Sequence, residues 1–218
     1  MRYLPVFLDL AGRRCVVLGG DRLAADKARQ LFEAGGRVTV FAASPGPEME
    51  ELATAAPLAL RRRDYRPGDL AGARVAIDAS GDEAINALSH EEADRERVLL
   101  NVVDVPDRCG FIAPAVVRRD PLLIAISTSG ESPWLAGALR ARLERLLGEE
   151  WGPFVALVGR TRRRLRRAGV PVADQEPVYR RLMASPIRRL LSEGRAAEAE
   201  LAAEAIAAEE RAAAARTR

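Results

Sequence analysis

The chain has 218 residues, of which 48% are hydrophobic and 30% are charged, and its formal net charge at pH 7 is +3. This balance excludes a disordered polyelectrolyte, and no apolar run is long enough for a transmembrane helix, so we expect no membrane partner. The single histidine and the two cysteines exclude a multi-histidine metal site and a disulfide scaffold, and they indicate a cytoplasmic protein with reduced thiols.

Short apolar runs alternate with helical segments in the first half of the chain. Strands are expected at residues 14–19, 37–41, 58–62, 74–79 and 98–103, with helices at 23–34, 48–55 and 83–95. Strands that recur about every 25 residues with helices between them indicate βαβ units and a parallel sheet. We therefore predict an α/β fold with a Rossmann-like, doubly wound sheet, whose ligands bind at the carboxyl ends of the strands.

The pattern changes after residue 104. Two more strands are expected at 111–114 and 122–126, and helices at 134–147, 154–167 and 178–191. The last 24 residues are half alanine, with high helix propensity but almost no apolar stripe. They predict an exposed terminal helix.

A glycine turn lies between the first strand and the first helix. Gly19 and Gly20 stand where a dinucleotide fingerprint would begin, and Ala24 fits its final small position. Asp21 replaces the middle glycine, so its carboxylate would repel a pyrophosphate or cap the helix instead. These residues alone leave two readings open, a nucleotide site and an ordinary strand-to-helix turn.

The second strand lacks the acidic residue that usually binds the adenosine ribose of NAD. The strand ends in Phe41 and continues through Ala42 and Ala43 to Ser44. A ribose would have to be held by backbone groups and by Ser44. The NAD fingerprint therefore departs from its usual form at two points.

Three later motifs complete a recognisable order. They are Asn101–Asp104, Phe111–Pro114 and the run from Ile124 to Pro133. From about Tyr3 to Leu147 the chain resembles the precorrin-2 dehydrogenase family, which includes the N-terminal module of siroheme synthase.

The resemblance implies a function and a domain organisation. Family members use NAD to oxidise precorrin-2 to sirohydrochlorin, several also insert Fe²⁺, and they form homodimers. It implies an NAD-binding domain at 1–112, a dimerisation region at 113–148 and a small helical domain at 149–218.

Asp104 is the candidate catalytic residue. The aspartate of this motif is the family residue most closely tied to catalysis, and Asp104 follows an apolar strand at the expected ligand edge. Dehydrogenation releases a proton that a positioned carboxylate can accept. Its alternative role is to cap the turn before Pro106.

The resemblance also assigns binding residues. The cofactor-binding set is Gly19, Gly20, Arg22, Leu23, Ala43, Ser44, Ser80 and Asp82, and the substrate-binding set is Asn101, Thr128, Ser129, Gly130 and Ser132. Ser132 is also a natural N-cap, with Pro133 at the first helical position, so the loop has a purely structural reading as well.

Other functions remain open from the sequence. Asp21 could leave a chelatase or a tetrapyrrole-binding protein with impaired NAD use, or the chain could be a nucleotide-sensing module without chemistry. Six arginines between Arg160 and Arg167 could attract substrate carboxylates or form a solvated helix face. Aromatic residues are only 5% of the chain, which argues against a nucleic-acid partner.

Overall fold

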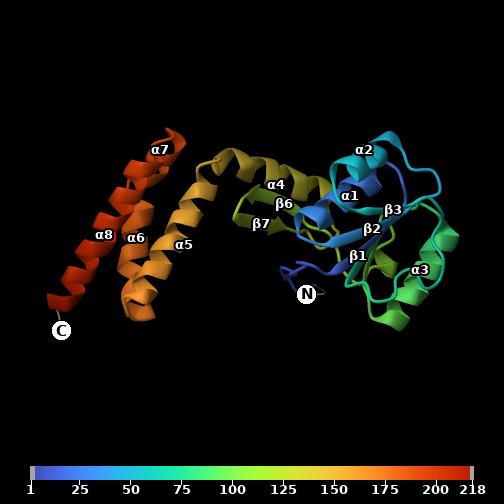
Figure 1. Ribbon diagram of the computed structural model, residues 1–218, viewed down its shortest axis with the longest axis horizontal. Helices are drawn as coiled ribbons and strands as arrows, with labels where there is room; N and C mark the ends of the chain where they lie inside the picture. The colour runs from blue at the N-terminus through green and yellow to red at the C-terminus, as the bar shows by residue number, and fades with distance from the viewer. Residues whose placement is uncertain (1–2, 217–218) are drawn as a thin grey trace. The chain divides into compact units, whose positions relative to one another are not determined.

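The computed structural model describes residues 3–216 and divides the chain into two compact units, Met1–Ala113 and Pro114–Arg218. Each unit is described by itself (Figure 1). The domain boundaries given above stay predictions.

A five-stranded parallel sheet forms the centre of the first unit. Its strands are β1 (Arg14–Leu18), β2 (Arg37–Phe41), β3 (Ala59–Arg61), β4 (Val75–Asp78) and β5 (Leu99–Val102). They are hydrogen-bonded in the order β3-β2-β1-β4-β5, with every neighbouring pair parallel. This is the order of a doubly wound dinucleotide fold, which confirms the predicted fold class.

Helices cover both faces of this sheet. Helices α1 (Arg22–Glu33) and α2 (Pro47–Ala55) contact each other and bury their apolar sides on one face, whereas α3 (Glu83–Glu96) packs on the other face. Figure 1 shows α1 and α2 together, with α3 on the opposite side of the strands. Successive side chains of β1 alternate between the two cores: Val17 belongs to the α1–α2 side, and Val16 and Leu18 belong to the α3 side.

The second unit begins with an antiparallel hairpin of β6 (Ala115–Arg119) and β7 (Leu122–Ile126), followed by α4 (Pro133–Leu146). The strand expected at 111–114 is therefore wrong. The carbonyl of Phe111 accepts a hydrogen bond from the Asn101 side chain at 3.0 Å, and the Phe111 ring packs on the core beside α1 and α2. The segment is thus held to the first unit as a coil, and pairing starts at Ala115.

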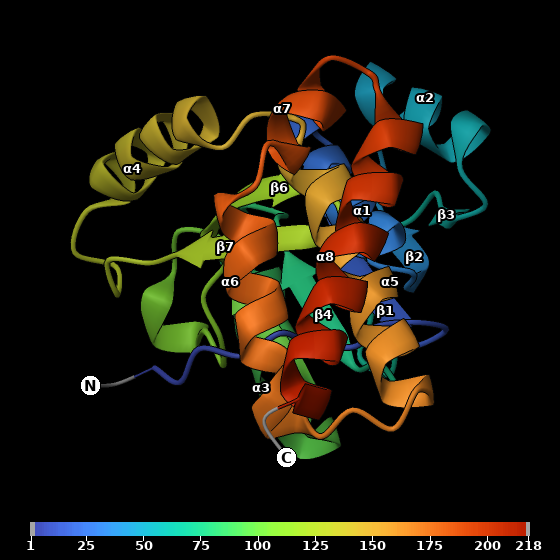
Figure 2. The same ribbon diagram turned by 90° about the vertical axis from the view of Figure 1, so that its left-hand side faces the viewer.

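Four helices complete the chain, namely α5 (Trp151–Arg167), α6 (Glu176–Ala184), α7 (Ile187–Ser192) and α8 (Ala196–Arg216). A single helix at 178–191 was expected, but the chain breaks it at Ser185 and Pro186. Ser185 is extended, as the residue before a proline tends to be. Figure 2 shows α5, α6 and α8 alongside one another.

Helix α8 is not the exposed tail that its composition indicated. Ala199 and Ala203 are fully buried, in one core with Phe154, Leu157 and Leu182. Because alanine side chains are small, they let α8 approach α5 and α6 closely. Alanines therefore form the apolar contact of this helix, for which larger residues were expected. Among the described residues, no helix combines the length and hydropathy needed to cross a bilayer.

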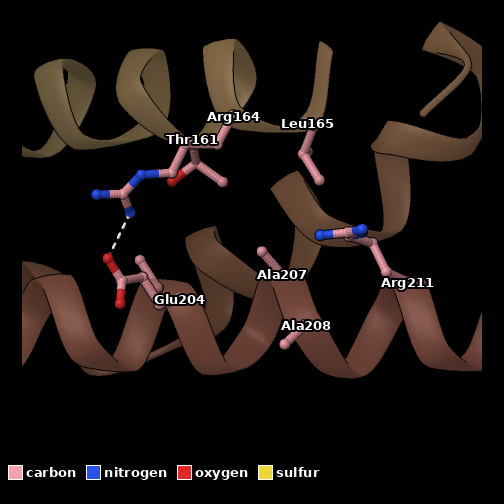
Figure 3. A pocket seen from close by; sticks show the side chains of 8 residues that line it. Thr161, Arg164, Leu165, Glu204, Ala207, Ala208 and Arg211 are labelled. Carbon is pink, nitrogen blue, oxygen red and sulfur yellow. Dashed lines mark ion pairs between the residues drawn. The ribbon is translucent and has the colours of Figure 1, made fainter. Parts of the chain in front are cut away.

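The arginine cluster of α5 is partly used within the fold. Arg160 pairs with Glu200, and Arg164 pairs with Glu204 at 2.7 Å, so both reach across to α8. Figure 3 shows the Arg164–Glu204 pair among the residues that line a pocket between these helices. Interhelical pairing was neither of the two roles predicted for the cluster, although its other four arginines are exposed as a solvated face requires.

Candidate functional site

The glycine turn requires both of its glycines. Gly19 has φ +114°, and a Cβ on it would lie 2.4 Å from the backbone oxygen of Ala79. A Cβ on Gly20 would lie 2.9 Å from Ala42 Cβ and 2.9 Å from Pro45 Cα. The absence of side chains here lets the carboxyl ends of β1, β2 and β4 meet closely.

Asp21 caps α1. Its Oδ1 accepts a hydrogen bond from the Ala24 backbone N–H at 2.8 Å, and Ala24 is fully buried as the last fingerprint position requires. The capping reading of Asp21 is therefore confirmed, and it removes one potential phosphate donor. Within residues 3–216, the backbone N–H groups of Arg22 and Leu23 donate to no protein acceptor. These two groups at a helix N-terminus fit a pyrophosphate.

The loop after β2 lies against the same turn. The Gly46 N–H donates to the Gly20 carbonyl at 2.8 Å. Ala43 and Ser44, which lie between the end of β2 and Gly46 in the chain, are exposed. Both predicted cofactor residues are thus at the carboxyl edge of the sheet with the glycine turn.

The loop after β4 rests on a buried carboxylate. Asp78 is only 1% exposed; its Oδ1 accepts from Ser80 N–H at 3.0 Å and from Ser80 Oγ at 2.6 Å, and its Oδ2 accepts from Ser89 Oγ at 2.7 Å. Asp82 accepts from the N–H groups of Ala84 and Ile85 and so begins α3. Asp78 therefore fixes where Ser80 and the start of α3 lie.

Asp78 was missed in the sequence, although one signal for it was present. An acidic residue inside the apolar run 74–79 would be buried with the strand. Because an unpaired buried charge is costly, such a residue indicates that polar groups bind it.

Asp104 lies two residues beyond the end of β5, at the same edge. It is exposed, and its φ of +61° is a left-handed conformation that costs most side chains free energy, although aspartate tolerates it better than most. The turn is anchored on both sides, since Val103 N–H donates to Asp78 O at 2.9 Å and Val105 N–H donates to Val102 O at 3.3 Å. These hydrogen bonds fix the backbone of the turn, and the Asp104 carboxylate is exposed to solvent.

Polar groups of Asn101 and Cys109 support this turn. Besides its hydrogen bond to Phe111, the Asn101 amide lies 3.4 Å from Cys109 Sγ, and that thiol donates to the Val102 carbonyl at 3.1 Å. Asn101 is 9% exposed, so its contacts organise the loop; its predicted role in binding substrate stays a prediction.

Arg108 joins the Asp104 loop to α3. It lies in the short 3-10 turn Pro106–Arg108 and donates to Glu83 Oε1 at 2.6 Å. The hydrogen bond from Arg108 to Glu83 raises the pKa of the guanidinium. No local pattern indicates this pair, because the two residues are 25 positions apart.

The predicted substrate loop belongs to the second unit. Thr128 Oγ1 donates to Ser132 O and accepts from Ser132 N–H, both at 3.0 Å, and Ser132 Oγ caps α4 by accepting from Leu135 N–H at 3.2 Å. Ser129 and Gly130 have φ of +57° and +90° and make the tight bend between them. The capped-helix reading is confirmed, and substrate binding by these residues stays a prediction.

The first unit therefore gathers ten predicted residues at one sheet edge. These are Gly19, Gly20, Arg22, Leu23, Ala43, Ser44, Ser80, Asp82, Asn101 and Asp104. No group of three or more His, Cys, Asp or Glu side chains suited to a metal ion occurs in the part of the chain that the structure describes.

Comparison with known families agrees with this arrangement. Residues 6–115 match the family described as "Putative NAD(P)-binding", which is half of the chain. The chain belongs to this NAD(P)-binding family. Residues 119–146 match a second model, described as "Sirohaem biosynthesis protein central".

Relatives of this NAD(P)-binding chain are named siroheme synthases. It is 39% identical over 215 residues to a siroheme synthase of Methylococcus capsulatus, covering 97% of this chain and 45% of the relative. It is 34% identical over 211 residues to siroheme synthase 3 of Aeromonas hydrophila, covering 96% of this chain and 45% of that protein. The chain thus spans a little under half the length of these relatives.

The solved structure of SirC, a precorrin-2 dehydrogenase, matches with a TM-score of 0.74 and 24% identity, over 93% of this chain and 99% of that one. This likeness establishes the fold. Together with the two family matches, it confirms the resemblance noted in the sequence.

Proposed function

We propose that this protein oxidises precorrin-2 to sirohydrochlorin with NAD as the hydride acceptor, in siroheme biosynthesis. The observation that carries the proposal is Asp104, an exposed carboxylate on an anchored turn at the carboxyl edge of a dinucleotide-type sheet. The siroheme names of the relatives, and the precorrin-2 dehydrogenase name of the solved structure, support the choice of substrate.

The residues at the glycine turn suit a dinucleotide, which when bound supplies a hydride acceptor. The backbone N–H groups of Arg22 and Leu23 would hold its pyrophosphate at the start of α1, and the exposed loop of Ala43 and Ser44 would face its ribose. Ser80, supported by Asp78, would border the cofactor from β4.

Asp104 would handle the proton of the reaction. Oxidation of a carbon–carbon single bond to a double bond removes one hydride and one proton from the macrocycle. The Asp104 carboxylate accepts the proton and, being exposed, passes it to water.

The same carboxylate could serve metal insertion, in which Fe²⁺ as a substrate displaces two pyrrole protons. Iron insertion was implied by the resemblance and stays a prediction, as does the cytoplasmic location expected from the presence of only two cysteines.

Homodimer formation is part of the proposal. Large apolar side chains of β7 and α4 are exposed, including Trp134 at 81% and Leu146 at 67%. Exposed apolar surface of this kind is typical of interfaces. Light scattering on the purified chain should give twice the mass of one chain.

An anaerobic assay tests the proposed reaction. Purified protein, precorrin-2 and NAD⁺ should yield the absorption spectrum of sirohydrochlorin, with NADH formed in equal amount. Adding Fe²⁺ in a parallel reaction tests insertion. Absence of turnover at saturating NAD⁺ would refute the dehydrogenase proposal and leave a chelatase or a binding protein.

A further inference from the structure

The outer face of α5 carries four exposed arginines that the fold does not use. They are Arg162, Arg163, Arg166 and Arg167. At 3.6 residues per turn these positions cover about 140° of the helix surface, and the buried Thr161 and Leu165 lie on the opposite side. The four arginines therefore lie on the solvent side of α5, away from the core that it forms with α6 and α8.

These four arginines differ from six other arginines of the helical part in having no acidic partner. The six pair with glutamates, some on their own helix and some on a neighbouring one. They are Arg160, Arg164, Arg180, Arg181, Arg189 and Arg195. Helix α5 contains no Asp or Glu, and within residues 3–216 none of the four outer arginines makes an ion pair. Their charge is therefore available to a ligand.

The cluster is unfavourable in the protein alone. Like charges four residues apart on a helix repel each other, and Arg162 and Arg163 each have an arginine at that spacing. The helix macrodipole favours cations in the last turn, which accounts for Arg166 and Arg167 but not for the two arginines one turn earlier. A bound polyanion would offset the repulsion among all four.

Small apolar residues precede the arginines on the same face. Val155, Ala156 and Gly159 are half-buried and lie one to two turns before them. A Cβ on Gly159 would lie 3.5 Å from Nη1 of Arg163, and no other described residue beyond its own helical turn comes within 4 Å. The surface beside this guanidinium is therefore open, with an apolar patch next to a set of forked donors. Such a surface suits a macrocycle with carboxylates on its edge.

We propose that the outer face of α5 binds the carboxylates of a tetrapyrrole, as a second binding site on the unit that does not contain Asp104. The choice of a tetrapyrrole rests on the proposed function, because precorrin-2 carries many carboxylates around its ring. Arginine forks match carboxylates through two parallel hydrogen bonds. Each such contact is weak when exposed to water, so binding depends on several arginines acting together.

Arginine footprinting tests the site locally and requires no turnover. Phenylglyoxal modifies exposed arginines, and mass spectrometry gives the rate at each position. Uroporphyrin I, a stable macrocycle with eight carboxylates, should slow modification of the four outer arginines by about threefold or more near saturation. Coproporphyrin I, with four carboxylates, should protect them less. Exposed arginines of the first unit that make no ion pair within residues 3–216 should react equally with and without the porphyrin. These internal controls are Arg13, Arg29, Arg66 and Arg74.

A pair of variants assigns the protection to charge at this face. Arg162→Gln with Arg166→Gln removes two charges and keeps helix propensity. The uroporphyrin concentration that half-protects Arg163 and Arg167 should then rise about fivefold. The matched control is Arg13→Gln with Arg29→Gln, which loses the same net charge from the first unit and should leave that concentration unchanged. Circular dichroism checks that both variants keep the native helix content.

The outcomes separate this inference from the proposed function. If uroporphyrin I leaves the rates at the four outer arginines unchanged, the inference is overturned. Equal shifts in the two double variants would also overturn it, because only net charge would then matter. A DNA oligonucleotide that protects these arginines at lower concentration than uroporphyrin I would replace the tetrapyrrole by a nucleic acid. Failure of the precorrin-2 assay would refute the proposed reaction alone, since footprinting uses neither NAD⁺ nor turnover.

Discussion

The carboxyl edge of the sheet and the helical end of the chain use charged residues in opposite ways. At the sheet edge, Asp78 is buried beneath a loop, while Asp104 is exposed and its carboxylate makes no hydrogen bond or ion pair within residues 3–216. Between α5 and α8, arginines of one helix are paired with glutamates of the other. Charge that is satisfied inside the fold stabilises it, whereas charge that the fold holds in place but leaves open is available for chemistry.

The largest effect is expected from the exposed carboxylate. Asp104→Asn keeps the left-handed backbone that asparagine also tolerates, but it cannot accept the proton. We expect turnover of precorrin-2 to fall by about 100-fold or more, with binding of the dinucleotide unchanged. Anaerobic absorbance measures turnover, and titration measures binding.

Asp107→Asn is the control for this change, because Asp107 is exposed three residues further along the same loop. Its turnover should stay close to that of the native protein. Comparable losses in both variants would contradict a specific role for Asp104.

An intermediate effect is expected where the edge depends on its buried support. Asp78→Ala removes the carboxylate that accepts the shorter hydrogen bonds from the hydroxyls of Ser80 and Ser89, and loss of a buried hydrogen-bond partner is costly. We expect the free energy of unfolding in urea to fall by about 3 kcal/mol. Asp64→Ala, at an exposed position, should leave it almost unchanged. A loss below about 1 kcal/mol would show that Asp78 is not a structural support.

The smallest effect is expected from the helical end. Both side chains of the Arg164–Glu204 pair are 51% exposed, so water screens their attraction. A double-mutant cycle with Arg164→Ala and Glu204→Ala should give a coupling energy of about 0.5 kcal/mol in urea unfolding. A coupling energy several times larger would mean that the ion pairs, rather than the buried alanines, hold α8 in place.

The alternating sheet was predictable because apolar strands and glycine turns are local signals, and β2 has the bounds that the sequence predicted. The prediction of an extra strand at 111–114 was wrong because Asn101, ten positions before Phe111, binds the Phe111 carbonyl. The prediction of an exposed α8 was wrong because alanine indicates helix propensity more strongly than it indicates burial. The burial of alanines such as Ala203 depends on contacts with α5 and α6, which local patterns do not show.

The candidate site was predictable in part. Its glycine turn, its exposed carboxylate and its capping residues follow from local spacing and from the resemblance. Asp78 under Ser80, and Arg108 bound to Glu83, depend on segments that meet only in the folded chain. Such supports are hard to foresee from local patterns.

The left-handed backbone of Asp104 limits which natural replacements could appear there. Glycine and asparagine fit the conformation at low cost, and neither carries an acid. Under the proposed function, drift at this one codon would therefore produce intact proteins that bind the dinucleotide but no longer oxidise the substrate. The proposal thus makes this residue a marker for separating active enzymes from inactive descendants when related genomes are surveyed.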